Sequence, residues 1–192
     1  LQHPNKNSYD ESVDLSGKLN VRYTITDSDG DTVFDELPMG SQIKFEDDGP
    51  KVYANETVLL DDDALGGNPD GPGDNDDSRY ADGTLGHSFG SDGGAISWIE
   101  GASGDFTFEK GEGNLLYVMQ GETKVLTLTL DPDNGNYTVT QNAPIKHTNG
   151  NNENNQSIEV GYRVTDGDGD SRDGSLKIDI DDDTPIARND TD

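Results

Sequence analysis

The sequence predicts an all-β fold, an antiparallel β-sandwich. Apolar side chains alternate with polar ones over short stretches, as expected of strands that bury one face. Turns rich in glycine and aspartate separate these stretches, and no window shows a convincing helical period. Many short strands joined by such turns are typical of two antiparallel sheets packed face to face.

The expected strands are read from the alternation of apolar residues. In chain order they cover residues 19–25, 106–108, 115–119, 126–130, 137–139, 158–164 and 176–180. Leu115–Met119 is apolar throughout, which favours a strand buried on both faces. Trp98 lies in another apolar stretch and is expected in the core rather than on a binding surface. Turn signals stand at 92–94, 111–113 and 133–135.

An internal repeat organises the chain. Residues 19–31 read LNVRYTITDSDGD and residues 158–170 read IEVGYRVTDGDGD, with matching positions 139 residues apart. Weaker similarity joins 43–50 (IKFEDDGP) to 178–185 (IDIDDDTP) and 1–3 (LQH) to 145–147 (IKH). A repeat this long indicates an array of domains rather than a solenoid.

The repeat predicts the domain boundaries. Residues 1–50 are expected to be the C-terminal part of a preceding repeat, which adds strands to the next unit or forms its own subdomain. Residues 51–185 form a complete repeat, and residues 186–192 begin a linker to a further module. The segment 61–77 is an acidic insertion rich in glycine and proline, either a plain surface loop or a loop that calcium orders around a ligand.

The charge of the chain is strongly one-sided. Acidic residues number 40 against 13 basic residues, for a formal net charge of -27. Such a surface disfavours nucleic acid, and no apolar stretch is long enough for membrane insertion. Two carboxylates about 4 Å apart repel by roughly 4 kcal/mol at an effective dielectric near 20, and a divalent cation between them reverses that sign. There is no cysteine, so a bound metal ion would have to stabilise the fold in place of disulfides.

Two acidic loops carry the clearest metal signature. The repeat contains the pattern D-x-D-G-D twice, and its aspartates are Asp27, Asp29, Asp31, Asp166, Asp168 and Asp170. Calcium takes six to eight oxygen ligands, and carboxylates at alternate positions of a tight turn can converge on one ion. Glycine permits the bend. The alternative is an ordinary acidic turn without metal.

Further acidic runs lie at the boundaries between repeats. The candidate calcium ligands there are Asp47 and Asp48 before Gly49-Pro50, and Asp181, Asp182 and Asp183 before Thr184-Pro185. Calcium at these positions would fix the angle between neighbouring modules, whereas the alternative is a solvated linker. Asp131 and Asp133 are a weaker candidate pair, because the sequence DPDNG is also a common turn.

Catalytic motifs are not apparent, so we expect a protein that is not an enzyme. The histidines His3, His87 and His147 lie in separate segments without metal-ligand spacing. Neither a nucleophile elbow nor a phosphate-binding loop is present. Aspartate pairs could form a glycosidase dyad, but here they lie in repeated turns that metal binding explains more simply.

Three segments together resemble a known family. ADGTLGHSFGSDGG at 81–94, DPDNGNYTVTQNAPIKH at 131–147 and VTDGDGDSRDGSLKIDIDDDTP at 164–185 are similar to the long repeat domains of type I-secreted giant RTX adhesins. The resemblance covers residues 51–185 as a whole repeat and 1–50 as the end of another. It implies an immunoglobulin-like fold, rigidity that depends on Ca2+, and secretion by a type I system to the extracellular bacterial cell surface.

Some adhesins of this kind also carry a calcium-dependent peptide-binding module that grips the free C-terminus of a target protein. The resemblance implies that the chain could be such a module in cell adhesion, with a peptide or protein on another cell surface as its partner. The candidate ligand-binding residues are then Asp70, Asp74, Asp76 and Asp77 of the insertion. The alternative is a purely structural extender. Either way, neighbouring adhesin repeats are expected partners, and the unit is expected to be monomeric within a long chain.

Overall fold

A computed structural model describes residues 11–67, 78–150 and 154–185 of the 192-residue chain. Its regular elements are β-strands, apart from two single-turn 3-10 helices, η1 (Gly40–Gln42) and η2 (Asp63–Leu65). The predicted all-β fold is therefore confirmed. Within the described ranges, no helix has the length and apolar character needed to cross a membrane.

The larger sheet has six antiparallel strands in the order β10-β11-β12-β13-β14-β7. They are β7 (Tyr80–Thr84), β10 (Gly101–Ser103), β11 (Phe106–Lys110), β12 (Leu115–Gln120), β13 (Thr123–Leu130) and β14 (Asn136–Gln141). Neighbours β10 to β14 follow one another in sequence, so short turns join them. Gly113 and Gly135 adopt φ values of 69° and 73° in two of these turns, a conformation that favours glycine.

The second sheet has four strands in the order β6-β16-β15-β9. They are β6 (Val58–Asp61), β9 (Gly94–Trp98), β15 (Gln156–Asp166) and β16 (Ser171–Asp181). The hairpin β15–β16 is long, and the loop 166–170 closes it. Strand β6 pairs with β16 in parallel, so the two strands end side by side with Asp61 opposite Asp181.

Side chains of both sheets form one hydrophobic core, consistent with a β-sandwich. From Ile158 on, every second residue of β15 is buried, and Leu126, Leu128 and Leu130 of β13 are likewise buried. Trp98 is 2% exposed, so the prediction that it belongs to the core is confirmed. In β12 the burial alternates after all: Leu116 and Val118 are buried while Leu115 is partly exposed, so the expectation of burial on both faces is wrong.

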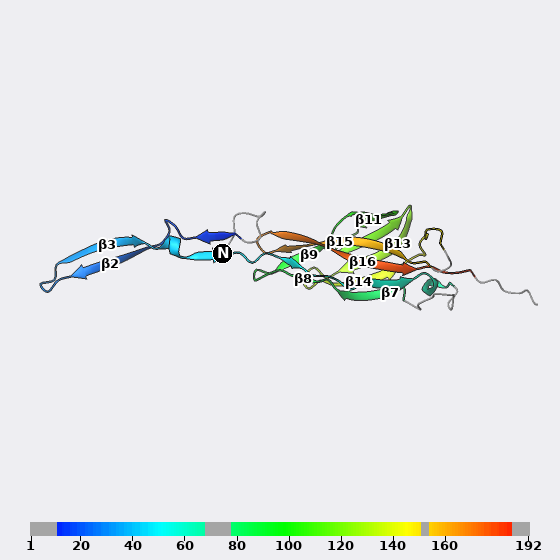
Figure 1. The fold of residues 1–192 in the computed structure, drawn as a ribbon, viewed down its shortest axis with the longest axis horizontal. Helices are drawn as coiled ribbons and strands as arrows, with labels where there is room; N and C mark the ends of the chain where they lie inside the picture. The colour runs from blue at the N-terminus through cyan, green and yellow to red at the C-terminus, as the bar shows by residue number, and fades with distance from the viewer. Residues whose placement is uncertain (1–10, 68–77, 151–153, 186–192) are drawn as a thin grey trace, which may run out of the picture.

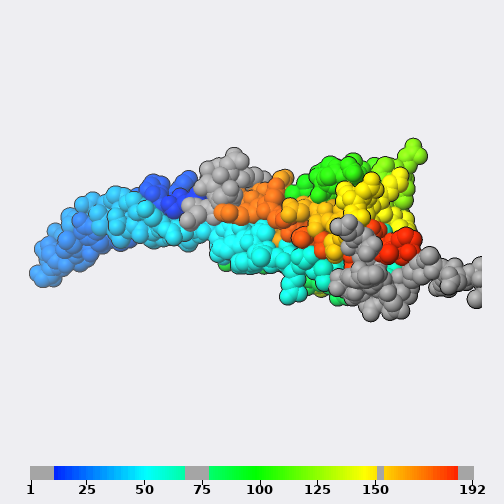
Figure 2. Space-filling view, turned by 45° about the vertical axis from the view of Figure 1, so that its right-hand side comes forward, coloured from blue at the N-terminus to red at the C-terminus, as the bar shows by residue number. Residues whose placement is uncertain are grey.

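The described residues before position 50 form a narrow arm (Figures 1 and 2). Its strands are β1 (Ser12–Asp14), β2 (Asn20–Thr26), β3 (Thr32–Pro38) and β4 (Lys44–Glu46). Within the described ranges these strands pair only with each other, as β1–β4 and β2–β3. The sequence left open whether these residues add strands to the next unit or form their own subdomain, and in the described ranges they pair as two ladders within the arm. The hairpin β2–β3 lies at the far end of an elongated molecule (Figure 1).

The arm lacks the burial of its sequence counterpart. Tyr23 and Ile25 of β2 are 48% and 61% exposed, whereas the matching Tyr162 and Val164 of β15 are fully buried. The same alternating pattern thus forms the same kind of hairpin in both places. Only the second hairpin has strands packed on its apolar face within the described residues.

A short connection links the arm to the sandwich. Strand β5 (Lys51–Val52) pairs with β8 (His87–Ser88). Just beyond it, the Asn55 amide donates to the hydroxyl of Tyr162 at 3.0 Å and to the carbonyl of Ser175 at 2.8 Å. The same side chain accepts a hydrogen bond from the backbone N–H of Gly86 at 2.7 Å. One amide therefore ties three segments together at the base of the sandwich.

Candidate metal centres

The clearest cluster lies where the arm meets the sandwich. Asp47 follows β4, while Asp168 and Asp170 lie on the loop between β15 and β16. One carboxylate oxygen from each of the three lies within 4.8 Å of the others. We call this group the junction cluster. The sequence predicts Asp47 as a calcium ligand at the boundary between repeats, and Asp168 and Asp170 as ligands in a D-x-D-G-D loop. The structure brings this boundary and this loop together.

The loop 166–170 is built around Asp166. Its carboxylate Oδ1 accepts hydrogen bonds from the backbone N–H groups of Gly169 at 3.0 Å and Asp170 at 2.8 Å. Gly169 has φ of 106°, which allows the chain to reverse so tightly. Asp166 therefore shapes the loop, and it leaves Asp168 and Asp170 to face Asp47.

Burial makes this concentration of charge costly. Desolvation, with help from the neighbouring Asp168 carboxylate, raises the pKa of Asp166 to about 6. Desolvation and the charges of Asp168, Asp47 and Glu11 also raise the pKa of Asp170, which is only 2% exposed. Within the described residues, neither oxygen of Asp170 nor Oδ2 of Asp168 receives a hydrogen bond. Buried carboxylate oxygens without donors are expected to face a cation or a proton.

The donor set of the junction cluster suits a hard divalent cation. Such ions prefer carboxylate oxygen over nitrogen or sulfur. Calcium ligands lie about 2.3–2.6 Å from the ion, so opposite ligands stand up to ~5 Å apart. The separation of at most 4.8 Å within the cluster is compatible with three oxygens around one ion. The junction cluster could therefore hold a metal ion.

The first D-x-D-G-D loop has the same shape in a different environment. Asp27, Asp29 and Asp31 also bring oxygens within 4.8 Å, and Asp27 Oδ1 accepts from the N–H of Asp31 at 2.9 Å. All three are exposed. Here the contact with Asp29 and the backbone N–H groups of the loop lower the pKa of Asp27. The burial of the loop, rather than its sequence motif, therefore decides whether its ionised carboxylates destabilise the fold.

A third cluster lies at the opposite end of the sandwich. It combines Asp62, next to β6, with Asp182, next to β16, and His147 from the segment after β14. The His147 Nε2 atom lies 3.3 Å from Asp62 Oδ2 and 3.8 Å from Asp182 Oδ1. Burial, the largest single effect, lowers the pKa of His147, but the two carboxylates together outweigh it and raise the pKa. We call this group the exit cluster.

The exit cluster corrects one sequence-based inference. In the sequence His147 has no metal-ligand spacing, but in the fold it lies beside the carboxylates of Asp62 and Asp182. Asp62 was seen only as part of the acidic insertion, and Asp182 was expected to act with its two neighbours. The available signal was the similarity of 145–147 to 1–3, which places a histidine in both copies of the repeat.

The other predicted ligands have different surroundings. Asp48 lies 3.7 Å from the Lys51 ammonium. Asp131 accepts hydrogen bonds from Asp133 N and Asn134 Nδ2 within an exposed turn.

Asp181 is buried opposite Asp61 and accepts a hydrogen bond from the backbone N–H of Asp182 at 3.2 Å. Asp183 is partly buried beside Gly67.

The proposed ligand-binding residues of the insertion lie elsewhere. Asp70, Asp74, Asp76 and Asp77 fall outside the described residues, so their role stays a prediction.

Comparison with known proteins gives a family but no activity. Neither the search of curated proteins nor the search of solved structures found a match. One protein family does match, over residues 57–179, which include both sheets except the last two residues of β16, together with the loop 166–170, but exclude the arm. The match covers more than half of the chain, and its description records no function. The chain therefore belongs to the family "Domain of unknown function (DUF5801)".

Proposed function

We propose that the chain is a calcium-dependent module of an extracellular bacterial surface adhesin, and that its calcium fixes the joint between neighbouring repeats. The junction cluster carries the proposal, because Asp47 comes from the arm while Asp168 and Asp170 come from the sandwich. An ion bound by all three would connect the two parts directly. The oxygen-only donors and the extracellular setting favour calcium over other ions.

The repeat supports a role in a tandem array. The hairpin β2–β3 copies β15–β16 in sequence, and its apolar face would be covered if the rest of an equivalent sandwich preceded it. The exposed Asp27, Asp29 and Asp31 would then face an earlier acidic run, as Asp168 and Asp170 face Asp47. Such an array would be long and stiff, in keeping with the elongated shape in Figure 1.

Small-angle X-ray scattering of the 192-residue chain tests this role. With calcium we expect an extended particle with a well-defined joint, and with chelator a wider distribution of shapes as the arm moves. Asp168→Asn with Asp170→Asn should behave like the chelated protein even in calcium. Asp131→Asn with Asp133→Asn is the matched control and should respond as the unmodified chain does. Identical scattering with and without calcium would contradict the proposal.

A second candidate function is calcium-dependent recognition of a peptide C-terminus, and one observation favours it. A cleft of about 640 Å³ opens at the end of the sandwich, lined by polar groups that include Asn149, Gly150, Asp183 and Thr184. Gly67, within the acidic insertion, lies against Asp183. The described part of the insertion thus reaches the edge of this cleft, which could receive a ligand. A calcium ion with an open coordination position would attract a terminal carboxylate.

A library of peptides with free C-termini, screened with calcium and with chelator, separates this candidate from a pure extender. Calcium-dependent binding that disappears when the peptide C-terminus is amidated would support recognition. Binding to no peptide would leave the structural role alone.

A further inference from the structure

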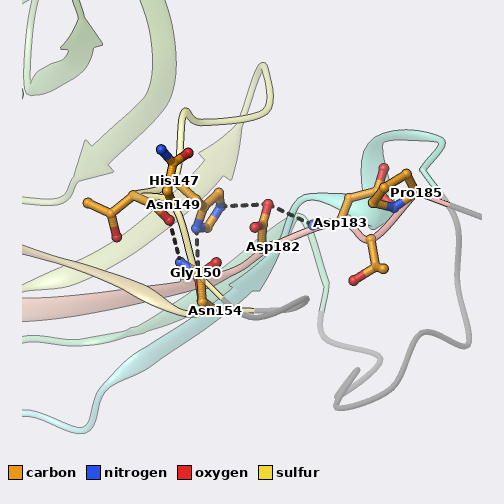
Figure 3. Close-up of a pocket in the computed structure, with 9 residues that line it drawn as sticks. His147, Asn149, Gly150, Asn154, Asp182, Asp183 and Pro185 are labelled. Atoms are coloured by element: carbon orange, nitrogen blue, oxygen red, sulfur yellow. Dashed lines mark hydrogen bonds and ion pairs between the residues drawn. The ribbon is translucent and has the colours of Figure 1, made fainter.

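The ring of His147 has a defined orientation in the exit cluster. Its Nδ1 atom lies 2.8 Å from the backbone carbonyl oxygen of Asn154. A carbonyl can only accept, so Nδ1 must carry the hydrogen. In the neutral ring, Nε2 then has a lone pair and no hydrogen. Figure 3 shows the ring between the Asn154 backbone and the Asp182 side chain.

The lone pair of Nε2 points toward negative charge. It faces Asp62 Oδ2 at 3.3 Å and Asp182 Oδ1 at 3.8 Å, and it makes no hydrogen bond within the described residues. The His147 side chain is 4% exposed, so water does little to screen this repulsion. The lone pair of a neutral imidazole is repelled by the two carboxylates here, and a positive charge at Nε2 would turn this repulsion into attraction. That charge is either a proton on Nε2 or a metal ion.

The carboxylates are held in place before any ion arrives. Asp62 is 3% exposed, and the backbone N–H of Ile145 donates to its Oδ2 at 3.0 Å, while the Gln141 amide donates to Oδ1. Asp182 Oδ1 accepts from the N–H of Asp183 at 3.0 Å. These hydrogen bonds fix the orientation of both carboxylates. A histidine that donates its second ring hydrogen to a backbone carbonyl is the usual arrangement around a metal-ligating imidazole.

The distances also suit a small ion. Zinc binds imidazole nitrogen and carboxylate oxygen at about 2.0–2.2 Å, so two ligands of a tetrahedral ion stand roughly 3.4 Å apart. The Nε2–Oδ2 separation of 3.3 Å is close to this value, and the 3.8 Å between Nε2 and Asp182 Oδ1 requires only a small movement of a side chain that is 26% exposed. Calcium and magnesium bind nitrogen poorly, which distinguishes this site from the junction cluster.

We propose that Asp62, His147 and Asp182 bind a transition-metal ion of the zinc class, at a site separate from the oxygen-only junction cluster. The cleft beside His147 and Asp182 leaves room for water or an external group as a further ligand. The module would then carry two kinds of metal site, one at each end of the sandwich. This assignment does not depend on the proposed adhesin function.

Titration of the untagged 192-residue chain with Zn2+ tests the site, with excess calcium present to occupy oxygen-only clusters. Calorimetry should detect a zinc site that His147→Gln weakens at least tenfold and that Asp182→Asn also weakens. His87→Gln is the matched control, since His87 lies at the other end of the sandwich, and it should leave zinc affinity unchanged. The double variant Asp168→Asn, Asp170→Asn should also bind zinc normally. Unchanged zinc affinity in His147→Gln would overturn the proposal.

Nuclear magnetic resonance of the unmodified chain decides the matter even if a variant fails to fold. The imidazole nitrogen shifts distinguish a protonated Nε2 from one bound to metal. We expect the Nε2 signal of His147 to shift on adding Zn2+, while Nδ1 keeps its hydrogen. If Nε2 instead remains protonated in saturating zinc, the positive charge between the carboxylates is a proton and there is no metal site.

Discussion

Asp47 and Asp170 come from two different copies of the repeat pattern, yet their carboxylate oxygens lie within 4.8 Å of each other. Asp170 is buried, and the charge of Asp47 contributes to the raised pKa of Asp170. The arm and the sandwich therefore repel each other at their point of contact unless a cation or a shared proton lies between the two carboxylates. Both the stability of the chain and the rigidity of the joint should then depend on divalent metal.

Removal of calcium should lower the melting temperature. Extracellular calcium sites often have dissociation constants near 0.1–1 mM, and a tenfold excess over such a constant stabilises by about 1.4 kcal/mol per site. For a chain of this size, each kcal/mol changes the melting temperature by roughly 2–4 °C. Scanning calorimetry in 10 mM calcium and in EDTA should therefore differ by several degrees. A melting curve that EDTA leaves unchanged would rule out stabilisation of the fold by bound metal.

Replacing Asp168 and Asp170 together by asparagine should have opposite effects with and without calcium. Without metal, the variant loses the repulsion among buried carboxylates and should melt at a higher temperature than the unmodified chain. With calcium it lacks two ligands and should melt at a lower temperature. Thermal scans in calcium and in EDTA measure this reversal in the sign of the melting-temperature difference between the variant and the unmodified chain. The exposed pair Asp27→Asn and Asp29→Asn is the control, and should raise the metal-free stability much less.

The pH dependence of the metal-free chain should follow Asp166. Its pKa is about 6 in the folded chain, above the ordinary 3.8, so the native state binds this proton more tightly than the unfolded chain does. The ionised group therefore destabilises the fold above pH 6, and this penalty is lost as the pH falls from 6 toward 4. In EDTA, the melting temperature should rise over that interval. Asp166→Asn should flatten the rise, and a steady fall in the unmodified chain would contradict the assignment.

Sequence alone could predict the elements but not the clusters. Alternating residues such as Leu126 and Leu128 identify a strand because the period of the side chains is a local property. The D-x-D-G-D loops were predictable for the same reason. The union of Asp62 with His147 was not, since 85 positions separate them and hydrogen bonds from Gln141 and Ile145 to Asp62 bring their segments together. The arm shows the opposite limit, because identical alternation at Tyr23 and Tyr162 leads to opposite exposure.

Asn55 should be a critical residue for the stability of the sandwich, although it belongs to none of the three clusters found in the described residues. Its amide group makes three hydrogen bonds, to Tyr162, Ser175 and Gly86, and the hydroxyl of Tyr162 also donates to the carbonyl of Gly86 at 3.1 Å. Asn55→Ala removes all three bonds and leaves the partly buried N–H of Gly86 without its acceptor. A loss of about 1–3 kcal/mol is expected, measurable by urea denaturation.

The control for this variant is Asn142→Ala. Asn142 donates a side-chain hydrogen bond to the Thr127 hydroxyl at 2.9 Å on the exposed surface, where water can replace the lost contact. Its stability should change by less than about 0.5 kcal/mol. Because neither asparagine hydrogen-bonds to a member of the three clusters found in the described residues, the loss in Asn55→Ala should be the same in calcium and in EDTA. A loss that appeared only in EDTA would mean that the amide acts through the junction cluster instead of tying the three segments together.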